Sequence, residues 1–524
     1  MKKSFVWIVV VFILCSLALS ACVTVNKDPS KGSEIVSTYD GEDTGTGNTV
    51  SGVTTTKKSG ESTADPSTSA KVDYVRQIDN TVEESIINGN YRTGNSEYLP
   101  EETIKKYEQL TNLPTLYITL DNNKKLKDVQ HSVYTGGQYT FVDNHVIESY
   151  YEQRLQIKGR GNWSWSFAQR PYTMKFDKKA DLMGMGAAKK WVLVTVHSDK
   201  TMMHNFMTQK FAKALGLRGT CDNEYIDVVV NGEYVGTYVL TEKIQIHKER
   251  IDLVDDQGIL FEIEMCYRHS CNRCVVLYEN RSDRSRTIHL ELLKYKDWDL
   301  DKLTRAQQSF LNDKLILMQQ YFDLFAKCMQ EDDWETLTRM MDVDSFVNWY
   351  LLNELTRNYD SAFVTSCYCF INEDNKVCMG PVWDFDTCYG IQDSSYNSQH
   401  IQDAPWFGWL IRNCPEFVEL VEKRWTEIRQ KDGLLYDFYT AIDAIAEYIS
   451  VSEKMEHELY PTSELLNVPF DEAVKYFKTW LKNRVVWMDA QFLIEDAEDS
   501  EIDKTVMFTT TTRRHGKSDP STNP

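Results

Sequence analysis

Two apolar, β-branched runs joined by an Asn-Gly pair constrain the fold of this chain more than any other local feature. The runs cover Tyr225–Val230 and Tyr234–Leu240, and Asn231-Gly232 stands between them. Asn-Gly favours a two-residue hairpin turn, because both residues tolerate positive φ. Shorter apolar runs bounded by turn residues, such as Leu116–Leu120 and Leu155–Lys158, repeat this pattern. The first half of the folded region is therefore predicted to contain an antiparallel sheet.

The second half carries apolar residues at helical spacing. Thr304–Gln330 and Val343–Leu355 follow this period, and from Val474 to Phe492 the apolar residues form one buried stripe on a long helix. A further helix, Met202–Leu215, lies within the β-patterned half and ends at Gly216. The predicted fold class is α+β, with a β-rich N-terminal lobe, a helix-rich C-terminal lobe and a cleft between them.

The N-terminus has the features of an export signal. Two lysines precede an apolar run, Phe5–Leu19, which is shorter than a membrane span. The run closes on Leu19-Ser20-Ala21-Cys22, which resembles a bacterial lipobox and predicts lipidation of Cys22. Buried acyl chains contribute roughly 0.8 kcal/mol per CH₂ to anchoring. We expect an extracytoplasmic lipoprotein of the bacterial cell membrane, touching the membrane through this anchor only. An ordinary signal peptide cut after Ala21 is the alternative.

Polar segments flank the aromatic-rich centre of the chain. Both are poor in large apolar residues and cannot bury enough surface to offset their ordering entropy. We predict a signal peptide at 1–21, a lipidated cysteine and flexible tether at 22–95, a folded domain at 96–495 and a disordered tail at 496–524. A domain of about 400 residues exceeds the roughly 250–300 residues at which single cores stop growing, which favours two lobes. The net charge of −20 argues against a nucleic-acid partner.

Seven of the ten cysteines of the folded region fall into two groups. Cys266, Cys271 and Cys274 make a dense cluster around His269. Zinc is one interpretation, but the spacing is not a standard one, and a local disulfide with one free thiol suits an exported protein better. The other group is interpreted mainly as small core residues. It consists of Cys367, Cys369, Cys378 and Cys388.

A predicted hairpin brings three aspartates together. Ser366–Ile371 and Val377–Val382 read as its two strands, and a turn joins them. The start of the first strand then lies beside the end of the second. Asp360 directly precedes the hairpin, and Asp384 and Asp386 directly follow it. Three carboxylates are therefore expected to converge at one end of the ribbon.

Such a cluster suits a divalent cation and phosphate chemistry. Mg²⁺ usually binds one or two carboxylates plus substrate phosphates, and a separate aspartate can orient or deprotonate a hydroxyl. Asn358 belongs to the same group by position. The alternative is structural, because Asp in an Asn-x-Asp-Ser sequence is often a turn or cap residue.

Basic residues in the first half are candidates for phosphate contacts. Arg160 lies between two glycines in Lys158–Asn162, Lys175 lies on a predicted strand, and Lys243 follows the Asn-Gly hairpin. Each has a plain alternative: a tight turn around Arg160, solvent exposure for Lys175, and a cross-strand pair of Glu242 with Lys243.

Taken in order, these stretches resemble the spore-coat protein H (CotH) kinase family over roughly Leu113–Leu493. The motifs are Ile157–Asn162, Arg170–Tyr172 with Lys175, Leu182–Met185, Lys190–Leu193, Ser198–Lys200 with Asn205, Val230–Gly236, Leu240–Lys243, Asn353-Glu354, Asn358–Ser361 and Gly380–Asp386. Each motif alone is modest, but their order over this length is specific.

The resemblance implies an atypical protein-kinase-like fold and phosphate transfer from ATP, with Mg²⁺ or Mn²⁺, to serine or threonine hydroxyls of a protein substrate. By this resemblance Asp360 matches the catalytic aspartate and Asp384 the metal-binding aspartate, with Asp386 beside it. Arg160, Lys175, Lys243 and Asn358 are the nucleotide-binding candidates. One departure is His204, which stands where the family usually has arginine.

Two other function classes remain as alternatives. One is a non-catalytic module for cell-surface or cell-wall binding on the same fold. The other is a glycoside hydrolase that uses Asp360 with Asp384 or Asp386, since two carboxylates about 5–10 Å apart satisfy its geometry. The basic candidates fit neutral sugars poorly.

Overall fold

The computed structural model describes residues 72–76, 101–147, 151–253, 259–266, 274–278, 287–293, 302–463, 465–494, 502–503 and 505. These residues belong to one compact unit, residues 66–524. The predicted signal peptide, Cys22 and most of the predicted tether lie outside the described residues and stay predictions.

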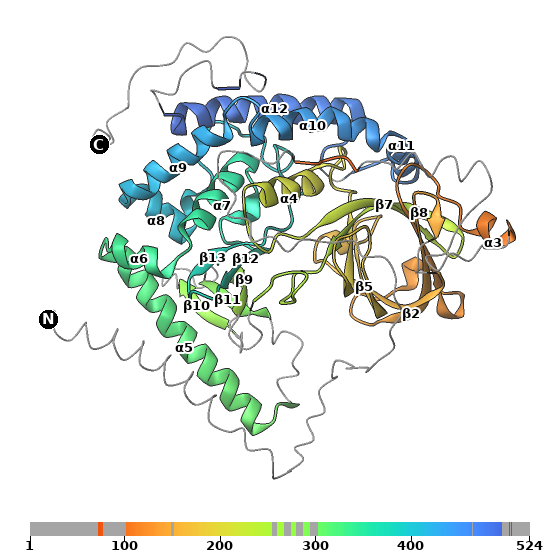
Figure 1. Cartoon of the computed structure of the whole chain (residues 1–524), viewed down its shortest axis with the longest axis horizontal. Helices are drawn as coiled ribbons and strands as arrows, with labels where there is room; N and C mark the ends of the chain where they lie inside the picture. Colours follow the sequence, from red (N-terminus) through yellow and green to blue (C-terminus); the bar gives the residue numbers. More distant parts are fainter. Residues whose placement is uncertain are drawn as a thin grey trace, which may run out of the picture. The chain divides into compact units, whose positions relative to one another are not determined.

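The first half folds into a closed, barrel-like sheet (Figure 1). After helix α3 (Glu101–Lys106) come β1 (Thr115–Leu120), β2 (Thr135–Asp143), β3 (Val146–Ile147), β4 (Gln153–Gly159), β5 (Tyr172–Ala180), β6 (Ala188–Thr195), β7 (Asn223–Val230) and β8 (Glu233–Glu242). The strand order is β1-β7-β8-β6-β5-β4-β2-β3, and an additional β1–β2 pairing closes the ring. The pairs are antiparallel except β1–β7, which is parallel.

The predicted Asn-Gly hairpin is confirmed as β7 and β8. Asn231 and Gly232 have φ of 52° and 84°, the left-handed conformation that this turn requires. Inside the barrel, alternate side chains form a continuous apolar core that includes Met174, Trp191 and Leu240. The prediction of an antiparallel sheet did not include closure, because closure depends on β1 pairing with two strands that lie far apart in the sequence.

A second, antiparallel sheet combines strands from both halves of the chain. It contains β9 (Ile259–Cys266), β10 (Cys274–Tyr278), β11 (Thr287–Leu292), β12 (Cys367–Ile371) and β13 (Val377–Met379), in the order β10-β11-β9-β12-β13. The predicted hairpin between the acidic residues is confirmed as β12–β13, although β13 ends before the cis peptide bond Gly380–Pro381.

Four cysteines in and after the β12–β13 hairpin behave as small core residues. Cys367, Cys369, Cys378 and Cys388 are free and buried, as predicted. Cys274 is disulfide-bonded, which favours the disulfide interpretation of its cluster. Cys271 and His269 lie outside the described residues.

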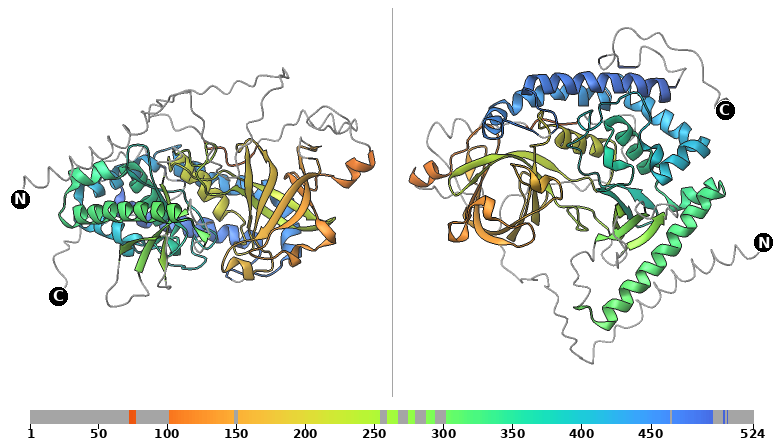
Figure 2. Two further views of the ribbon diagram at one scale, coloured as in Figure 1. Left: turned by 90° about the horizontal axis from the view of Figure 1, so that it is seen from below. Right: turned by 180° about the vertical axis from the view of Figure 1, so that it is seen from behind.

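Helices cover the second sheet and part of the barrel. They are α4 (His204–Ala214), α5 (Arg305–Gln330), α6 (Trp334–Met340), α7 (Val343–Thr356), α8 (Pro405–Asn413), α9 (Pro415–Ile428), α10 (Leu434–Tyr448), α11 (Ser450–Leu459) and α12 (Phe470–Phe492). Figure 2 shows α5 as a long helix beside the second sheet, where the Gln319 side chain donates to and accepts from the Val276 backbone. The apolar stripe of α12 is buried, as predicted, and its members Phe477 and Leu481 belong to the largest core.

Both polar flanks contain short segments that pack on the domain, and the predicted domain boundaries stay predictions. Tyr74 is buried in the largest core, and Arg76 donates to Asp143 at 2.6 Å. Ile502 forms an antiparallel bridge with Gln430, and the Asp503 N–H donates to the Arg429 carbonyl oxygen. These contacts are made by single residues, such as Tyr74 and Ile502, within otherwise polar stretches. The average composition of a stretch does not predict such isolated contacts.

The α+β class is confirmed, with a β-rich N-terminal region followed mainly by helices. The kinase-like division into two lobes with a cleft stays a prediction. Among the described residues, no helix has the length and apolar character needed to cross a membrane.

Candidate functional site

The first part of the site follows the C-terminus of α7. Arg357 caps this helix in the left-handed conformation, with φ of 49°. Asn358 comes next, and its Oδ1 accepts a hydrogen bond from the Asp360 N–H at 3.2 Å. A short 3-10 turn, Tyr359–Ser361, then carries the half-buried Asp360. Asn358 therefore fixes the backbone that presents Asp360.

The β12–β13 hairpin brings Asp384 beside Asn358, as the predicted hairpin requires. The Asn358 Nδ2 donates to the Asp384 carbonyl oxygen at 3.4 Å, and the Ser366 Oγ donates to the Asp384 carboxylate at 3.2 Å. Asp384 has φ of 70°, which is uncommon for a residue with a side chain and is tolerated best by Asp, Asn and Gly. Residues in such conformations often mark functional sites.

The connection between β6 and α4 supports the same loop. The Ser198 Oγ donates to the Asp386 carboxylate, and Asn205 accepts a hydrogen bond from the Phe385 N–H at 2.6 Å. Ser198 and Asn205 belong to one sequence motif, Ser198–Lys200 with Asn205, which predicted no role for either residue. Their contacts are with residues almost two hundred positions away, so local spacing carried no signal for them.

Asp384 lies close enough to Asp360 and to Asp386 to change the protonation of both. Burial, followed by the charge of Asp384, raises the pKa of Asp360 to about 6. Burial and the same charge raise the pKa of Asp386 to about 7. Burial also raises the pKa of Asp384, against the opposing effect of Arg160. The site gathers more negative charge than it neutralises, which is the electrostatic setting that a cation relieves.

Arg160 is the predicted basic residue that the structure brings to the carboxylates. Its guanidinium lies 4.8 Å from the Trp383 ring centroid and is close enough to Asp384 to interact with it electrostatically. Burial lowers the pKa of Arg160, and the neighbouring Tyr368 and Asp384 partly offset this effect. No hydrogen bond or ion pair joins its guanidinium to another described residue, so its donors can serve a ligand.

Lys175 and Lys243 lie outside this group of contacts. Lys175 is exposed on the outer face of the barrel, opposite Lys190 in the β5–β6 register. Lys243 follows directly after β8. Its neighbour Glu242 forms a buried ion pair with Arg250. No contact described for the three aspartates involves either lysine.

Two residues near Arg160, Glu262 and Tyr368, were not identified as candidates from the sequence. Glu262 on β9 lies opposite Tyr368 on β12, and the Tyr368 hydroxyl donates to its carboxylate at 3.1 Å. Both interact electrostatically with Arg160. Only the pairing of β9 with β12 brings Glu262 here, and the two strands are about a hundred residues apart.

His204 stands where the resembled family usually has arginine, and its ring lies among aromatic side chains. Its side chain is buried between Tyr389 and Phe477, with ring centroids at 4.9 and 4.7 Å. Burial lowers its pKa, although Asp199 lies 3.6 Å from its Nδ1.

A buried ion pair anchors the helix that carries Asn358. The Arg484 Nη2 on α12 donates to Glu354 on α7 at 2.6 Å, and both side chains are fully buried. Glu354 also accepts from the His400 N–H, and the His400 ring meets the Asn358 carbonyl oxygen at 2.5 Å. This network fixes the end of α7 against α12 and the loop around His400.

The donor set fits a cation that keeps most of its ligands on water and substrate. Within the described ranges, no group of three or more His, Cys, Asp and Glu side chains is arranged as a metal cage. Asp384 and Asp386 supply two carboxylates, and Mg²⁺ is typically bound by one or two carboxylates with phosphates and water.

Comparison with known families agrees with the sequence pattern. A family model described as CotH kinase protein matches residues 157–488, a span that includes every candidate residue from Arg160 to Asp386. No curated protein matches the chain.

Proposed function

Because the chain belongs to the CotH kinase family, we propose that it is an atypical protein kinase that transfers phosphate from Mg-ATP to serine or threonine hydroxyls. The observation that carries this proposal is the convergence of Asp360, Asp384 and Asp386 with Arg160 at one end of the β12–β13 hairpin.

Each residue has a role that its position supports. Asp384 and Asp386 would hold Mg²⁺ or Mn²⁺, which when bound neutralises charge on the transferred phosphate. Arg160 would contact phosphate oxygens, and Asn358 would hold Asp360 and the Asp384 backbone in register. Lys175 and Lys243, which lie outside these contacts, stay nucleotide-binding candidates through the family resemblance alone.

Asp360 would act on the acceptor. The substrate hydroxyl oxygen forms a bond to the terminal phosphorus of ATP while the bond from phosphorus to ADP breaks, and Asp360 accepts the hydroxyl proton. A pKa of about 6 suits this task, because a base works best with a pKa near the operating pH. The proposal includes the kinase-like two-lobed arrangement and the extracytoplasmic, lipid-anchored location.

The test is nucleotide binding and phosphate transfer by residues 23–524. Both flanks are kept, because Tyr74 and Ile502 pack on the domain. Calorimetry with ATP and Mg²⁺ or Mn²⁺ should detect binding that Asp384→Asn abolishes, since asparagine tolerates the positive φ at this position. Asp360→Asn should keep nucleotide binding and lower the rate of transfer by 10²-fold or more.

The matched control is Asp344→Asn, which changes an exposed carboxylate in the first turn of α7. It should change neither binding nor transfer. A folded protein that binds no nucleotide with either metal refutes the proposal, and a non-catalytic surface module then becomes the better account.

A further inference from the structure

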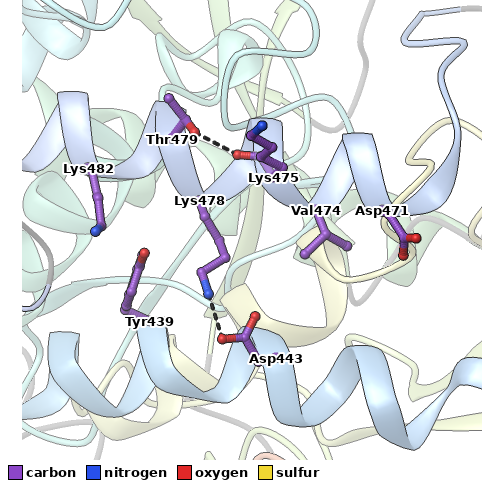
Figure 3. Close-up of a pocket in the computed structure, with 8 residues that line it drawn as sticks. All are labelled: Tyr439, Asp443, Asp471, Val474, Lys475, Lys478, Thr479 and Lys482. Atoms are coloured by element: carbon purple, nitrogen blue, oxygen red, sulfur yellow. Dashed lines mark hydrogen bonds and ion pairs between the residues drawn. The ribbon is translucent and has the colours of Figure 1, made fainter.

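Arg160 differs from the cations that this fold pairs with a carboxylate. Figure 3 shows such a cation in a pocket between α10 and α12, where Lys478 forms an ion pair with Asp443 at 2.5 Å. The Arg160 guanidinium has no hydrogen bond or ion pair with another residue that the structure describes, although acidic groups surround it. The contacts that keep it in place therefore decide how it meets a phosphate.

The backbone of Arg160 is fixed, but this does not fix its side chain. The Arg160 N–H donates to the Pro171 carbonyl oxygen at 3.2 Å, directly after β4. Gly161 follows with φ of 82°, a conformation that suits a tight turn. Holding a long side chain in one rotamer costs conformational entropy, so contacts of the guanidinium itself must supply the order.

An aromatic ring holds one face of the guanidinium. Arg160 lies 4.8 Å from the centroid of the Trp383 ring, a distance typical of cation–π contacts. The Trp383 side chain is buried in a small apolar cluster with Val192 of β6 and Tyr368 of β12. This contact orients the plane of the guanidinium without using any of its N–H donors.

A buried hydrogen bond lies beside the same guanidinium. Glu262 on β9 and Tyr368 on β12 are cross-strand partners, and the Tyr368 hydroxyl donates to the Glu262 carboxylate at 3.1 Å. Arg160 interacts electrostatically with both residues. The phenol fixes the position of the carboxylate, which attracts the guanidinium while its N–H donors stay available for a ligand.

We propose that Tyr368 and Glu262 are positioning residues that act through Arg160. Together with the Trp383 ring, they keep the guanidinium beside Asp384 and its donors available to the phosphates of the bound nucleotide. The inference rests on the proposed function and deepens it, because a phosphate contact made from the barrel then depends on residues of the second sheet.

The experiment is a double-mutant cycle on ATP affinity, measured by calorimetry on residues 23–524 with Mg²⁺. Tyr368→Phe removes only the hydroxyl, and we expect it to weaken ATP binding by about tenfold, which partners that orient a ligand-contacting group typically contribute. In the Arg160→Ala background the same change should have no further effect, because the residue through which it acts is absent.

Glu262→Gln provides a second cycle, since glutamine can still accept the Tyr368 hydrogen bond. Loss of the negative charge by itself favours ATP equally in both backgrounds, whereas loss of positioning counts only where Arg160 is present. We therefore expect Glu262→Gln to be less favourable to ATP in the Arg160 background than in Arg160→Ala, by at least about threefold. Thermal melts check that each variant is folded.

The matched control is Tyr225→Phe, which removes another buried phenol hydroxyl, one that donates to the Met202 carbonyl oxygen at 2.8 Å. It should bind ATP like the unmodified chain. Unchanged ATP affinity in Tyr368→Phe, or equal losses with and without Arg160, overturns this inference alone. An unmodified chain that binds no ATP refutes the proposed function, and this inference with it.

Discussion

The buried ion pair between Glu354 and Arg484 provides the sharpest test of how the fold supports the candidate site. In Arg484→Leu, Glu354 would lose its counter-ion in a place with no access to water. Three backbone carbonyl oxygens would also lose a donor, since Arg484 donates to those of Glu354, Tyr396 and Ser398 at 2.8 Å. We therefore expect a large loss of stability from a change far from the protein surface.

The magnitude follows from the cost of an uncompensated buried charge, about 3–5 kcal/mol. The unfolding entropy of about 2.1 cal/mol/K per residue, over roughly 400 residues, is about 0.8 kcal/mol/K. The expected fall in Tm is therefore roughly 4–6 °C, measured by calorimetry or circular dichroism under conditions where unfolding is reversible. The double variant Arg484→Leu/Glu354→Leu should recover much of the loss, because apolar residues often replace a buried pair without cost.

The control is Arg339→Leu, which removes the same residue type from an ion pair with Glu335 whose side chains are 70% and 80% exposed. Such exposed helix pairs contribute about 0.3–0.5 kcal/mol, so Tm should fall by less than about 1 °C. Equal shifts for the two arginine variants would refute the reasoning. So would a double variant that is less stable than Arg484→Leu alone.

Three further predictions concern other parts of the fold. Burial raises the pKa of Glu456 from 4.5 to about 8. Between these pH values the folded state keeps a proton that the unfolded state releases. The free energy of unfolding should therefore fall by up to about 5 kcal/mol as the pH rises from 4.5 to about 8. Denaturant titrations at several pH values should show a flatter dependence in Glu456→Gln, and an unchanged slope would contradict the assignment. Gly390→Ala should lower the free energy of unfolding by at least about 2 kcal/mol, because φ is 87° and the new Cβ would meet Trp480. Gly216 has a similar φ but open space around its Cβ position, so Gly216→Ala should lose less. Equal losses in denaturant melts would exclude the Trp480 contact. Tyr74→Ala should lower the free energy of unfolding by about 3–5 kcal/mol in the same melts, because Tyr74 is 4% exposed and its ring packs edge-on against Phe438. Tyr396→Ala removes an exposed tyrosine and is the control. A loss for Tyr74→Ala no larger than that of the control would show that residues 72–76 are not anchored to the domain.

Local patterns in the sequence predicted the elements that lie around the candidate site. The Asn231-Gly232 turn and the β12–β13 hairpin depend on residues a few positions apart, so spacing alone predicts them. Because a hairpin brings its two ends together, the same local pattern predicted that Asp360 would approach Asp384.

Other parts of the site depend on pairings that no local pattern encodes. Glu262 reaches Tyr368 only through the register of β9 with β12, and Ser198 reaches Asp386 only because the β6–α4 connection packs against this loop. The barrel also decides that the Lys175 side chain lies exposed, opposite Lys190, and its predicted phosphate contact stays a prediction.

The sequence by itself determined where helices and turns form, which family the chain resembles and which carboxylates meet at the hairpin. These properties depend on short-range spacing and on motif order. Only the tertiary structure decided that the first sheet closes, because β1 must pair both with β2 and with β7, where Thr115 lies opposite Asp227. It also decided which buried charges meet, as Glu354 and Arg484 do across 130 residues. Such contacts depend on how sheets and helices pack against one another. The free energy of that packing is distributed over residues far apart in the sequence, so no short stretch of sequence predicts it.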